Sequence, residues 1–316
     1  MKRRVDEPAR SLTYVLWIGG PPGAGKTTVA RRIARRHGLR WYNADAHTWE
    51  HRDRALREGH PGAQRWEAMS PEERVLTTTP AELLELSLHH ERGPMVADDL
   101  RALPESPLTV AEGSTVTPDL VAGGVAAHER AVWLVPTAAW QRARLEDRGS
   151  GGRGRENVIA YQQLLAETIE RQTIACGVQV LRVDGSRDEE QTVAAVERLF
   201  ADALAAGPRA EGAGERRALL RYANDAVVAQ ARGYLARLWS SGTPESFVRT
   251  FVCECDDPDC DELLDVPVAE FEQTAAGTFV AQGTRRQLEL LGDADILERG
   301  NGERGGTHDG SFRSCG

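Results

Sequence analysis

The sequence lacks any apolar run that approaches the ~20 residues needed to span a bilayer. Its first apolar stretch, residues 12–18, is short and leads directly into Gly-Gly-Pro-Pro-Gly. No small-residue cleavage site follows this stretch, so the basic N-terminus in front of it does not indicate a secretory signal. We therefore expect a cytoplasmic protein without a membrane partner.

A surplus of basic residues is also missing. The 316 residues carry a formal net charge of −9, and 41% of them are apolar and 28% charged, as in ordinary soluble globular proteins. Proteins that mainly coat nucleic acid are normally basic, so a nucleic-acid partner is not expected. The length exceeds what one compact core usually needs and predicts two domains.

Cysteine is scarce, because the chain has only five. Three of them, Cys253, Cys255 and Cys260, fall within eight residues, whereas Cys176 and Cys315 stand apart. In a reducing compartment, a cluster of this kind indicates metal or thiol chemistry before disulfides.

Apolar periodicity predicts alternating strands and helices in the first two-thirds of the chain. Predicted strands cover residues 12–18, 39–42, 108–111, 131–135 and 178–183. Predicted helices cover residues 27–37, 80–90, 138–147, 156–175 and 188–205. Ser70 and Thr79 each begin a capping box, with proline at the first helical position. Strands that alternate with helices favour a parallel sheet with helices on both faces.

The segment between the first strand and the first helix fits the pattern G-x-x-x-x-G-K-[ST]. Glycines in such a loop let successive backbone N–H groups point into one concavity, and the following helix adds its positive end. We expect Lys26 to reach the β- and γ-phosphates and the Thr27 hydroxyl to ligate Mg²⁺. The segment therefore predicts binding of ATP or GTP with Mg²⁺. The residues expected to hold the nucleotide are Gly20, Pro21, Pro22, Gly23, Ala24, Gly25, Lys26, Thr27 and Thr28.

The stretch from Gly19 to Thr28 resembles the P-loop small-molecule kinases, a class that includes adenylate, shikimate and gluconate kinases, chloramphenicol phosphotransferase and zeta-toxin-like enzymes. The resemblance covers residues 11–205, and the chain also resembles actinobacterial ATP-binding proteins. It implies an α/β fold, a three-layer P-loop NTPase sandwich with a five-stranded parallel sheet in the order 2-3-1-4-5. It further implies that substrates bind across the carboxyl ends of the strands.

The domain organisation follows from these patterns. We expect a kinase-like nucleotide-binding domain at residues 1–206 and a linker at 207–214. Residues 215–298 are predicted to form a small α+β domain with a helix at 215–239 and the cysteine-rich segment. Residues 299–316 are glycine-rich and polar, which predicts a disordered tail.

Two acidic residues follow predicted strands. Asp45 comes just after the second strand, where related kinases place an acidic group that orients or deprotonates the acceptor hydroxyl. A role for Asp45 as the N-cap of the next helix is an open alternative. Glu112 ends the third strand, where the resemblance implies a carboxylate that supports Mg²⁺ through water, although Asp is the usual residue there. Asp98 and Asp99 are interpreted as a solvated helix start.

A basic, glycine-rich segment follows the fourth strand. By resemblance it is a lid that closes over the phosphates, with arginines that stabilise the transferring phosphoryl group. A flexible basic surface loop is the alternative. Arg142 and Arg144 belong to this segment, and the expected catalytic arginines are Arg148, Arg153 and Arg155.

Residues 47–54 lie where kinases of this class select the acceptor. His47 and His51 are four residues apart and share a predicted helical face. Because no third metal ligand is evident, a polar acceptor pocket with Trp49 beside it is favoured over a metal pair. A solvated helix with one buried tryptophan is an open alternative.

The cysteine cluster has the spacing Cys-x-Cys-x₄-Cys, and two interpretations are open. In one, Cys253, Cys255 and Cys260 hold Zn²⁺, with His308 or Cys315 as the candidate fourth ligand. In the other, which the incomplete ligand count favours, the cysteines are reduced structural thiols. The segment also resembles a small actinobacterial module with a Cys-Glu-Cys…Cys core.

These residues together predict a phosphotransferase that moves the γ-phosphoryl group of Mg·ATP to a small hydroxylated acceptor. Lys26, Asp45 and the lid arginines are its expected catalytic residues. The alternative is a nucleotide-dependent regulatory switch whose cysteine-rich module binds a protein partner or a metal.

Overall fold

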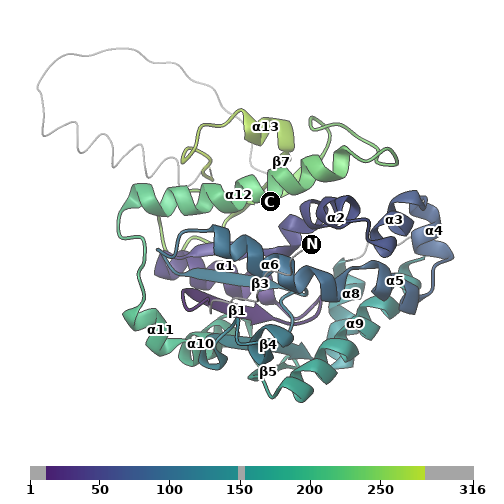
Figure 1. Cartoon of the computed structure of the whole chain (residues 1–316). Coiled ribbons are helices and arrows are strands. Elements are labelled where there is room, and N and C mark those ends of the chain that lie inside the picture. The colour runs from purple at the N-terminus through teal and green to yellow at the C-terminus, as the bar shows by residue number, and fades with distance from the viewer. Residues whose placement is uncertain (1–11, 149–153, 282–316) are drawn as a thin grey trace, which may run out of the picture. The chain divides into compact units, whose positions relative to one another are not determined.

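The centre of the fold is a five-stranded parallel sheet (Figure 1). The computed structural model describes residues 12–148 and 154–281. The strands are β1 (Val15–Gly19), β2 (Arg40–Asn43), β3 (Thr109–Gly113), β4 (Ala131–Pro136) and β5 (Val180–Val183). Their order in the sheet is β2-β3-β1-β4-β5, and every neighbouring pair is parallel. The α/β fold class and the strand order implied by the resemblance are confirmed.

Helices cover both faces of the sheet, because its strands present buried apolar side chains alternately to the two sides. Ile18 faces the layer that contains α1, α10 and α11. Trp17, the residue before it, faces the layer that contains α6 and α9. The bounds of these helices are α1 (Lys26–His37), α6 (His89–Ala102), α9 (Arg155–Cys176), α10 (Glu189–Leu199) and α11 (Ala201–Ala206). The result is a three-layer sandwich.

A chain of short helices connects β2 to β3. The two capping boxes at Ser70 and Thr79 are confirmed, since each side chain accepts a hydrogen bond from the backbone of the glutamate three residues later. The predicted helix 80–90 is too long, because Leu88 has a left-handed backbone with φ 59° and separates two helices. The elements here are η1 (Ala44–His47), α2 (Thr48–Arg57), α3 (Pro61–Ala68), α4 (Pro71–Leu76) and α5 (Pro80–Leu86).

The remaining elements of the sandwich complete its connections. The predicted helix 188–205 divides at Phe200, whose buried side chain packs among α1 and the sheet residues. The other elements are α7 (Asp119–Ala122), η2 (His128–Arg130) and α8 (Ala138–Arg148).

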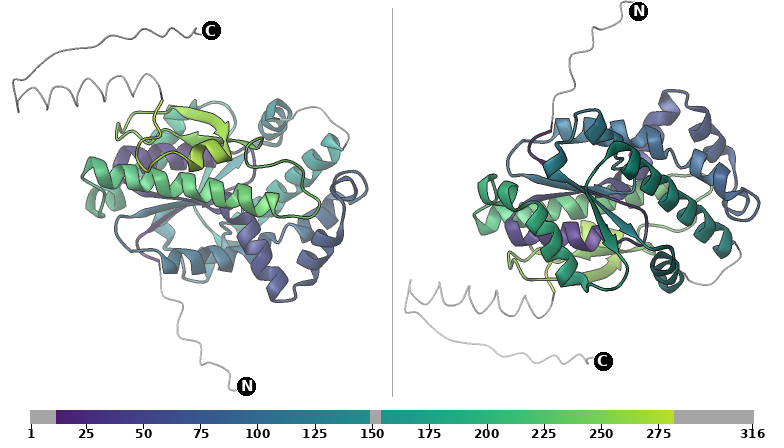
Figure 2. Two further views of the ribbon diagram at one scale, coloured as in Figure 1. Left: turned by 90° about the horizontal axis from the view of Figure 1, so that it is seen from above. Right: turned by 90° about the horizontal axis from the view of Figure 1, so that it is seen from below.

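The C-terminal part has α+β content, as predicted. It comprises α12 (Ala213–Leu235), an antiparallel hairpin of β6 (Val248–Val252) and β7 (Leu263–Pro267), and α13 (Val268–Glu272). A small core forms where the rings of Phe251 and Phe271 stack with their centroids 4.2 Å apart and Phe279 packs edge-on. The helix α12 lies alongside β2, the edge strand of the large sheet (Figure 2).

The chain divides into two compact units, Met1–Phe279 and Val280–Gly316. The boundaries expected from the sequence, 1–206, 215–298 and 299–316, stay predictions, and the tail lies outside the described residues. Among the described residues, none of the helices combines the length and the apolar character needed to cross a membrane.

Candidate active site

The glycine-rich loop leads from β1 into α1 at the carboxyl edge of the sheet. Two of its glycines are required by backbone geometry. Gly20 has φ 134°, and a Cβ there would stand 2.2 Å from the carbonyl oxygen of Leu134. Gly25 has φ 83° and is the N-cap of α1, so α1 starts at Lys26. The loop therefore surrounds the amino-terminal end of a helix, which is an anion-binding geometry.

Lys26 is buried, with 6% of its surface exposed. Its Nζ donates a hydrogen bond to the carbonyl oxygen of Pro21, over 3.0 Å, and so folds back across the loop. The loop is also fixed from the lid side, because Nε2 of the buried Gln141 donates to the carbonyl oxygen of Pro22, over 3.0 Å. Both contacts hold the loop in the curved form that a triphosphate needs.

Thr27 and Glu112 meet beneath the loop. Thr27 Oγ1 donates to Glu112 Oε1 over 3.1 Å. Glu112 is fully buried, and its Oε2 accepts no hydrogen bond from the residues that the structure describes. Burial raises the pKa of Glu112 to about 7, and Asp45 adds to this effect, whereas Lys26 opposes it. A nearby cation would stabilise the charged form of this buried carboxyl group.

The donors at this place fit Mg²⁺, which prefers oxygen ligands and keeps several of its waters. The Thr27 hydroxyl would bind it directly and Glu112 through water. A bound Mg²⁺ would offset the negative charge of the phosphates.

Asp45 lies at the same edge of the sheet, on η1. The strand register places Asn43 opposite Glu112. Ala44 lies close to Gly113, since a Cβ added to Gly113 would stand 2.7 Å from the Cβ of Ala44. Asn43, not Asp45, caps this turn, since its side chain accepts a hydrogen bond from the Asp45 backbone. The N-cap interpretation of Asp45 is therefore wrong, and its carboxyl group is exposed.

Arg92 holds the Asp45 turn from below. Arg92 Nη2 donates to the carbonyl oxygen of Ala44 over 2.6 Å, and Arg92 Nε donates to His51 Nδ1 over 3.2 Å. Because arginine is only a donor, His51 Nδ1 must accept, so the neutral ring carries its proton on Nε2 and donates to Asp99 Oδ2 over 2.7 Å. Burial lowers the pKa of His51, which agrees with a neutral ring.

This network corrects the interpretation of Asp99 as a solvated helix start. Asp99 lies in the last turns of α6 and also accepts from the Tyr42 hydroxyl over 2.6 Å. Burial acts to raise the pKa of Asp99, but the hydrogen bonds from His51 and Tyr42 bring it below its ordinary value. The His47 ring stacks on Tyr42 with the centroids 4.5 Å apart, and its centroid lies 6.2 Å from that of His51.

Trp49 packs against the C-terminal part of the chain, and an acceptor pocket beside it stays a prediction. Its ring packs against those of Tyr234 and Trp239, with centroid distances of 5.9 and 5.7 Å. Trp49 therefore joins α2 to the C-terminal part of the chain. Arg237 Nη2 also donates to the carbonyl oxygen of Trp49, over 3.4 Å, although 188 residues separate the two. Contacts between residues so far apart in sequence leave no signal in the local spacing.

The predicted lid arginines are only partly described. Arg155 begins α9, and its Nη2 donates to the carbonyl oxygen of Glu146. Arg142 forms ion pairs with Glu146 and Glu156, at 2.8 and 3.0 Å. Arg148 ends α8, but its side chain and the whole of Arg153 lie outside the described residues. Arg142 and Arg155 therefore tie together the two helices that flank the predicted lid.

A cavity of about 60 Å³ adjoins the loop. Gly25 and Thr28 form one wall, and Trp140, Arg144 and Arg187 form others. The guanidinium group of Arg144 lies 5.5 Å from the Trp140 ring centroid. An aromatic ring beside a phosphate loop suits a nucleobase. No local sequence pattern marks Trp140 or Arg187 as nucleotide-binding residues, although Trp140 precedes the predicted lid.

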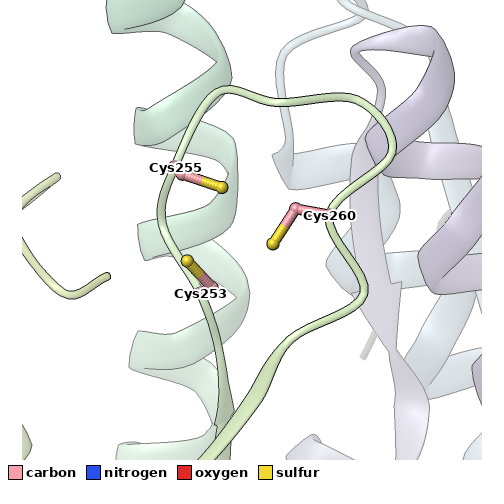
Figure 3. A group of neighbouring side chains, drawn as sticks. All are labelled: Cys253, Cys255 and Cys260. Atoms are coloured by element: carbon pink, nitrogen blue, oxygen red, sulfur yellow. The ribbon is translucent and has the colours of Figure 1, made fainter. Parts of the chain in front are cut away.

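The three clustered cysteines lie in the loop between β6 and β7 (Figure 3). Their sulfur atoms all lie within 4.8 Å of one another. This cluster is separate from the phosphate loop but contacts the same helix, α1, through Arg35. The candidate fourth ligands His308 and Cys315 lie outside the described residues.

Comparison with known proteins adds little detail. No family model matches the chain, and no curated protein matches it in sequence. A shikimate kinase from Bacteroides thetaiotaomicron has a similar structure, with 17% identity and a TM-score of 0.36, over 59% of this chain and 96% of that one. TT1252 from Thermus thermophilus has 22% identity and a TM-score of 0.36, over 58% of this chain and 96% of that one. Likenesses this distant say nothing about the substrate of this chain.

The fold class follows from the molecule itself. A parallel sheet in the order β2-β3-β1-β4-β5, with the glycine-rich loop between β1 and α1, defines a P-loop kinase fold.

Proposed function

We propose that this chain is a phosphotransferase that moves the γ-phosphoryl group of Mg·ATP to a small hydroxylated acceptor. The observation that carries the proposal is the convergence of Lys26, Thr27, Glu112 and Asp45 at one edge of the sheet. A hydrolase needs a phosphate loop and a metal-supporting carboxylate. The exposed carboxyl group of Asp45 is the feature that suits a second substrate, and Arg92 holds its turn through the carbonyl oxygen of Ala44.

In the proposed reaction, the acceptor oxygen forms a bond to the γ-phosphorus while the bond to the β,γ-bridging oxygen breaks. ADP leaves, and the acceptor proton passes to Asp45. Lys26 and the lid arginines offset the charge that spreads over the transferring group. Trp140 and Arg144 are proposed to hold the base, and the acceptor is proposed to bind beside Asp45.

The test is transfer of label from γ-labelled ATP to pools of nucleosides, sugars and aminoglycosides. Labelled product is expected from at least one pool. Asp45→Asn should lower transfer by roughly 10²–10⁴-fold and leave ATP affinity unchanged, because a general base acts only on the chemical step. Tight ATP binding without transfer to any pool would contradict the proposal.

A regulatory switch is the second candidate, and one contact favours it. The cysteine-bearing loop is held on α1, the helix that begins at the phosphate loop. ATP hydrolysis that is indifferent to small acceptors but changes when a protein partner is added would support this candidate. Lys26→Ala is expected to weaken nucleotide binding under both candidates and does not separate them.

A further inference from the structure

The cysteine loop brings three thiols to one point. Cys253 follows the last residue of β6, Cys255 lies two residues on, and the loop turns back so that Cys260 faces both (Figure 3). Every pair of sulfur atoms is within 4.8 Å. Tetrahedral zinc, with Zn–S bonds near 2.3 Å, places its sulfur ligands about 3.8 Å apart. The observed cluster therefore needs shifts of about 1 Å at most to surround a zinc ion.

A disulfide explains the arrangement less well. Cys255 and Cys260 are free thiols in the structure. A disulfide joins two sulfur atoms at about 2.05 Å and leaves the third without a role. Three sulfur atoms that converge on one centre instead form the face of a tetrahedron.

The backbone of the loop is fixed by Arg35 of α1. Its Nη1 donates to the carbonyl oxygens of Cys255 and Asp257, over 3.0 and 3.1 Å, and its Nη2 donates to that of Cys253. Two backbone bonds close the loop, from Cys253 N to Glu262 O and from Cys260 N to Asp257 O. The thiols are therefore brought together by contacts that need no ion.

Glu254 anchors the opposite side of the segment that follows β6. Side chains alternate along an extended backbone, so Glu254 points away from the side that carries Cys253 and Cys255. Its buried carboxylate forms an ion pair with Arg221 at 2.9 Å and accepts hydrogen bonds from Asn224 Nδ2 and Gly277 N, over 3.0 and 2.7 Å. With this anchor on α12 and Arg35 on α1, the loop is held from two sides.

The charges also suit a metal. Three thiolates around Zn²⁺ carry a net charge of −1, which is costly to bury unless a cation stands nearby. Arg35 Nη1 lies 3.5 Å from Cys255 Sγ and supplies that cation. Arginine remains charged even when buried, so this compensation persists at any ordinary pH.

We propose that Cys253, Cys255 and Cys260 bind one Zn²⁺ through three thiolates, with water in the fourth position and with Arg35 as the hydrogen-bonding partner of the ligand loop. The site is distinct from the proposed Mg²⁺ site and does not depend on the chain being a phosphotransferase. A soft ion such as Zn²⁺ is the chemistry that thiolate ligands select.

The experiment is metal analysis of the purified full-length chain, made under reducing conditions. One zinc per chain is expected by mass spectrometry of the metal. Cys260→Ser should lose it, whereas the matched variant Cys176→Ser, which changes a cysteine in α9, should keep it. Replacement of zinc by Co²⁺ should give intense thiolate-to-cobalt charge-transfer absorption and the visible bands of a tetrahedral ion.

Four results would overturn the proposal. One is a reduced chain that takes up neither zinc nor cobalt. Another is retention of zinc by a folded Cys260→Ser variant. The third is formation of a disulfide within the cluster in place of metal uptake. Loss of zinc in Cys315→Ser or His308→Ala would show that a protein residue, and not water, is the fourth ligand. That result would overturn the three-thiolate form. If Cys260→Ser does not fold, the cobalt spectrum of the unaltered chain decides.

Discussion

Thr27 Oγ1 donates a hydrogen bond to Oε1 of Glu112 over 3.1 Å, although 85 residues separate the two in sequence. The contact joins the first turn of α1 to the end of β3. It places the hydroxyl oxygen of Thr27 next to the fully buried carboxyl group of Glu112, and oxygen atoms are the ligands that Mg²⁺ prefers. The raised pKa of that group has a measurable consequence.

Replacement of Glu112 by Gln should change how stability depends on pH. Burial raises the pKa of Glu112 from 4.5 to about 7, so between these values the folded chain binds a proton that the unfolded chain has lost. Stability without nucleotide should therefore fall as pH rises through this window, by roughly 3 kcal/mol from this group. Urea unfolding at pH 5 and pH 8 measures the fall, and Glu112→Gln should remove that part of it. Equal falls in both proteins would contradict the assignment.

Replacement of Trp140 by Ala should weaken ATP binding roughly tenfold, because stacking on a base contributes about 1–3 kcal/mol. Calorimetry with ATP measures the loss. Inorganic triphosphate provides the control, since it has no base and should bind the variant and the original chain equally. A parallel loss of both affinities would show that Trp140 shapes the loop and does not contact the base.

Replacement of Asp99 by Ala should destabilise the fold by roughly 2–4 kcal/mol, because the buried hydrogen-bond donors of His51 and Tyr42 lose their shared acceptor. Asp98→Ala is the matched control. Asp98 pairs with Arg54 and Arg101 at the surface, where ion pairs contribute about 0–1 kcal/mol. Thermal unfolding of the two variants compares them, and similar losses would argue against the buried network.

Replacement of Arg35 by Gln should lower zinc affinity roughly 10–100-fold, the usual effect of removing a partner that orients metal ligands. Arg36→Gln is the control, since Arg36 pairs with Glu190 and Glu197 and not with the cysteine loop. Competition with a coloured chelator measures both affinities. An unchanged affinity in Arg35→Gln would separate Arg35 from the metal site.

Local signals in the sequence predicted much of the fold. The glycine-rich loop, the two capping boxes and the alternation of strands and helices each depend on residues within a few positions of one another. Such patterns are specified by backbone geometry and by burial on one side of an element. The strand order came from resemblance to P-loop kinases and agrees with the structure.

Contacts between distant residues were the part that could not be predicted. His51 and Asp99 are 48 residues apart; the sequence predicted His51 in an acceptor pocket and Asp99 on a solvated helix start, and neither has a local pattern that points to the other. Arg35 and Cys255 are 220 residues apart, and neither has a local pattern that points to the other. Only the folded chain brings such pairs together.

The position of α12 beside β2 has a consequence for any shortened form of this protein. An uncovered edge strand offers its free backbone groups to strands of other molecules. A chain cut after α11 would lose the helix that lies against β2, and would leave Arg31 and Arg35 without the loop that they hold. We therefore expect such a fragment to self-associate. By covering β2, the C-terminal third would then protect the sheet against aggregation.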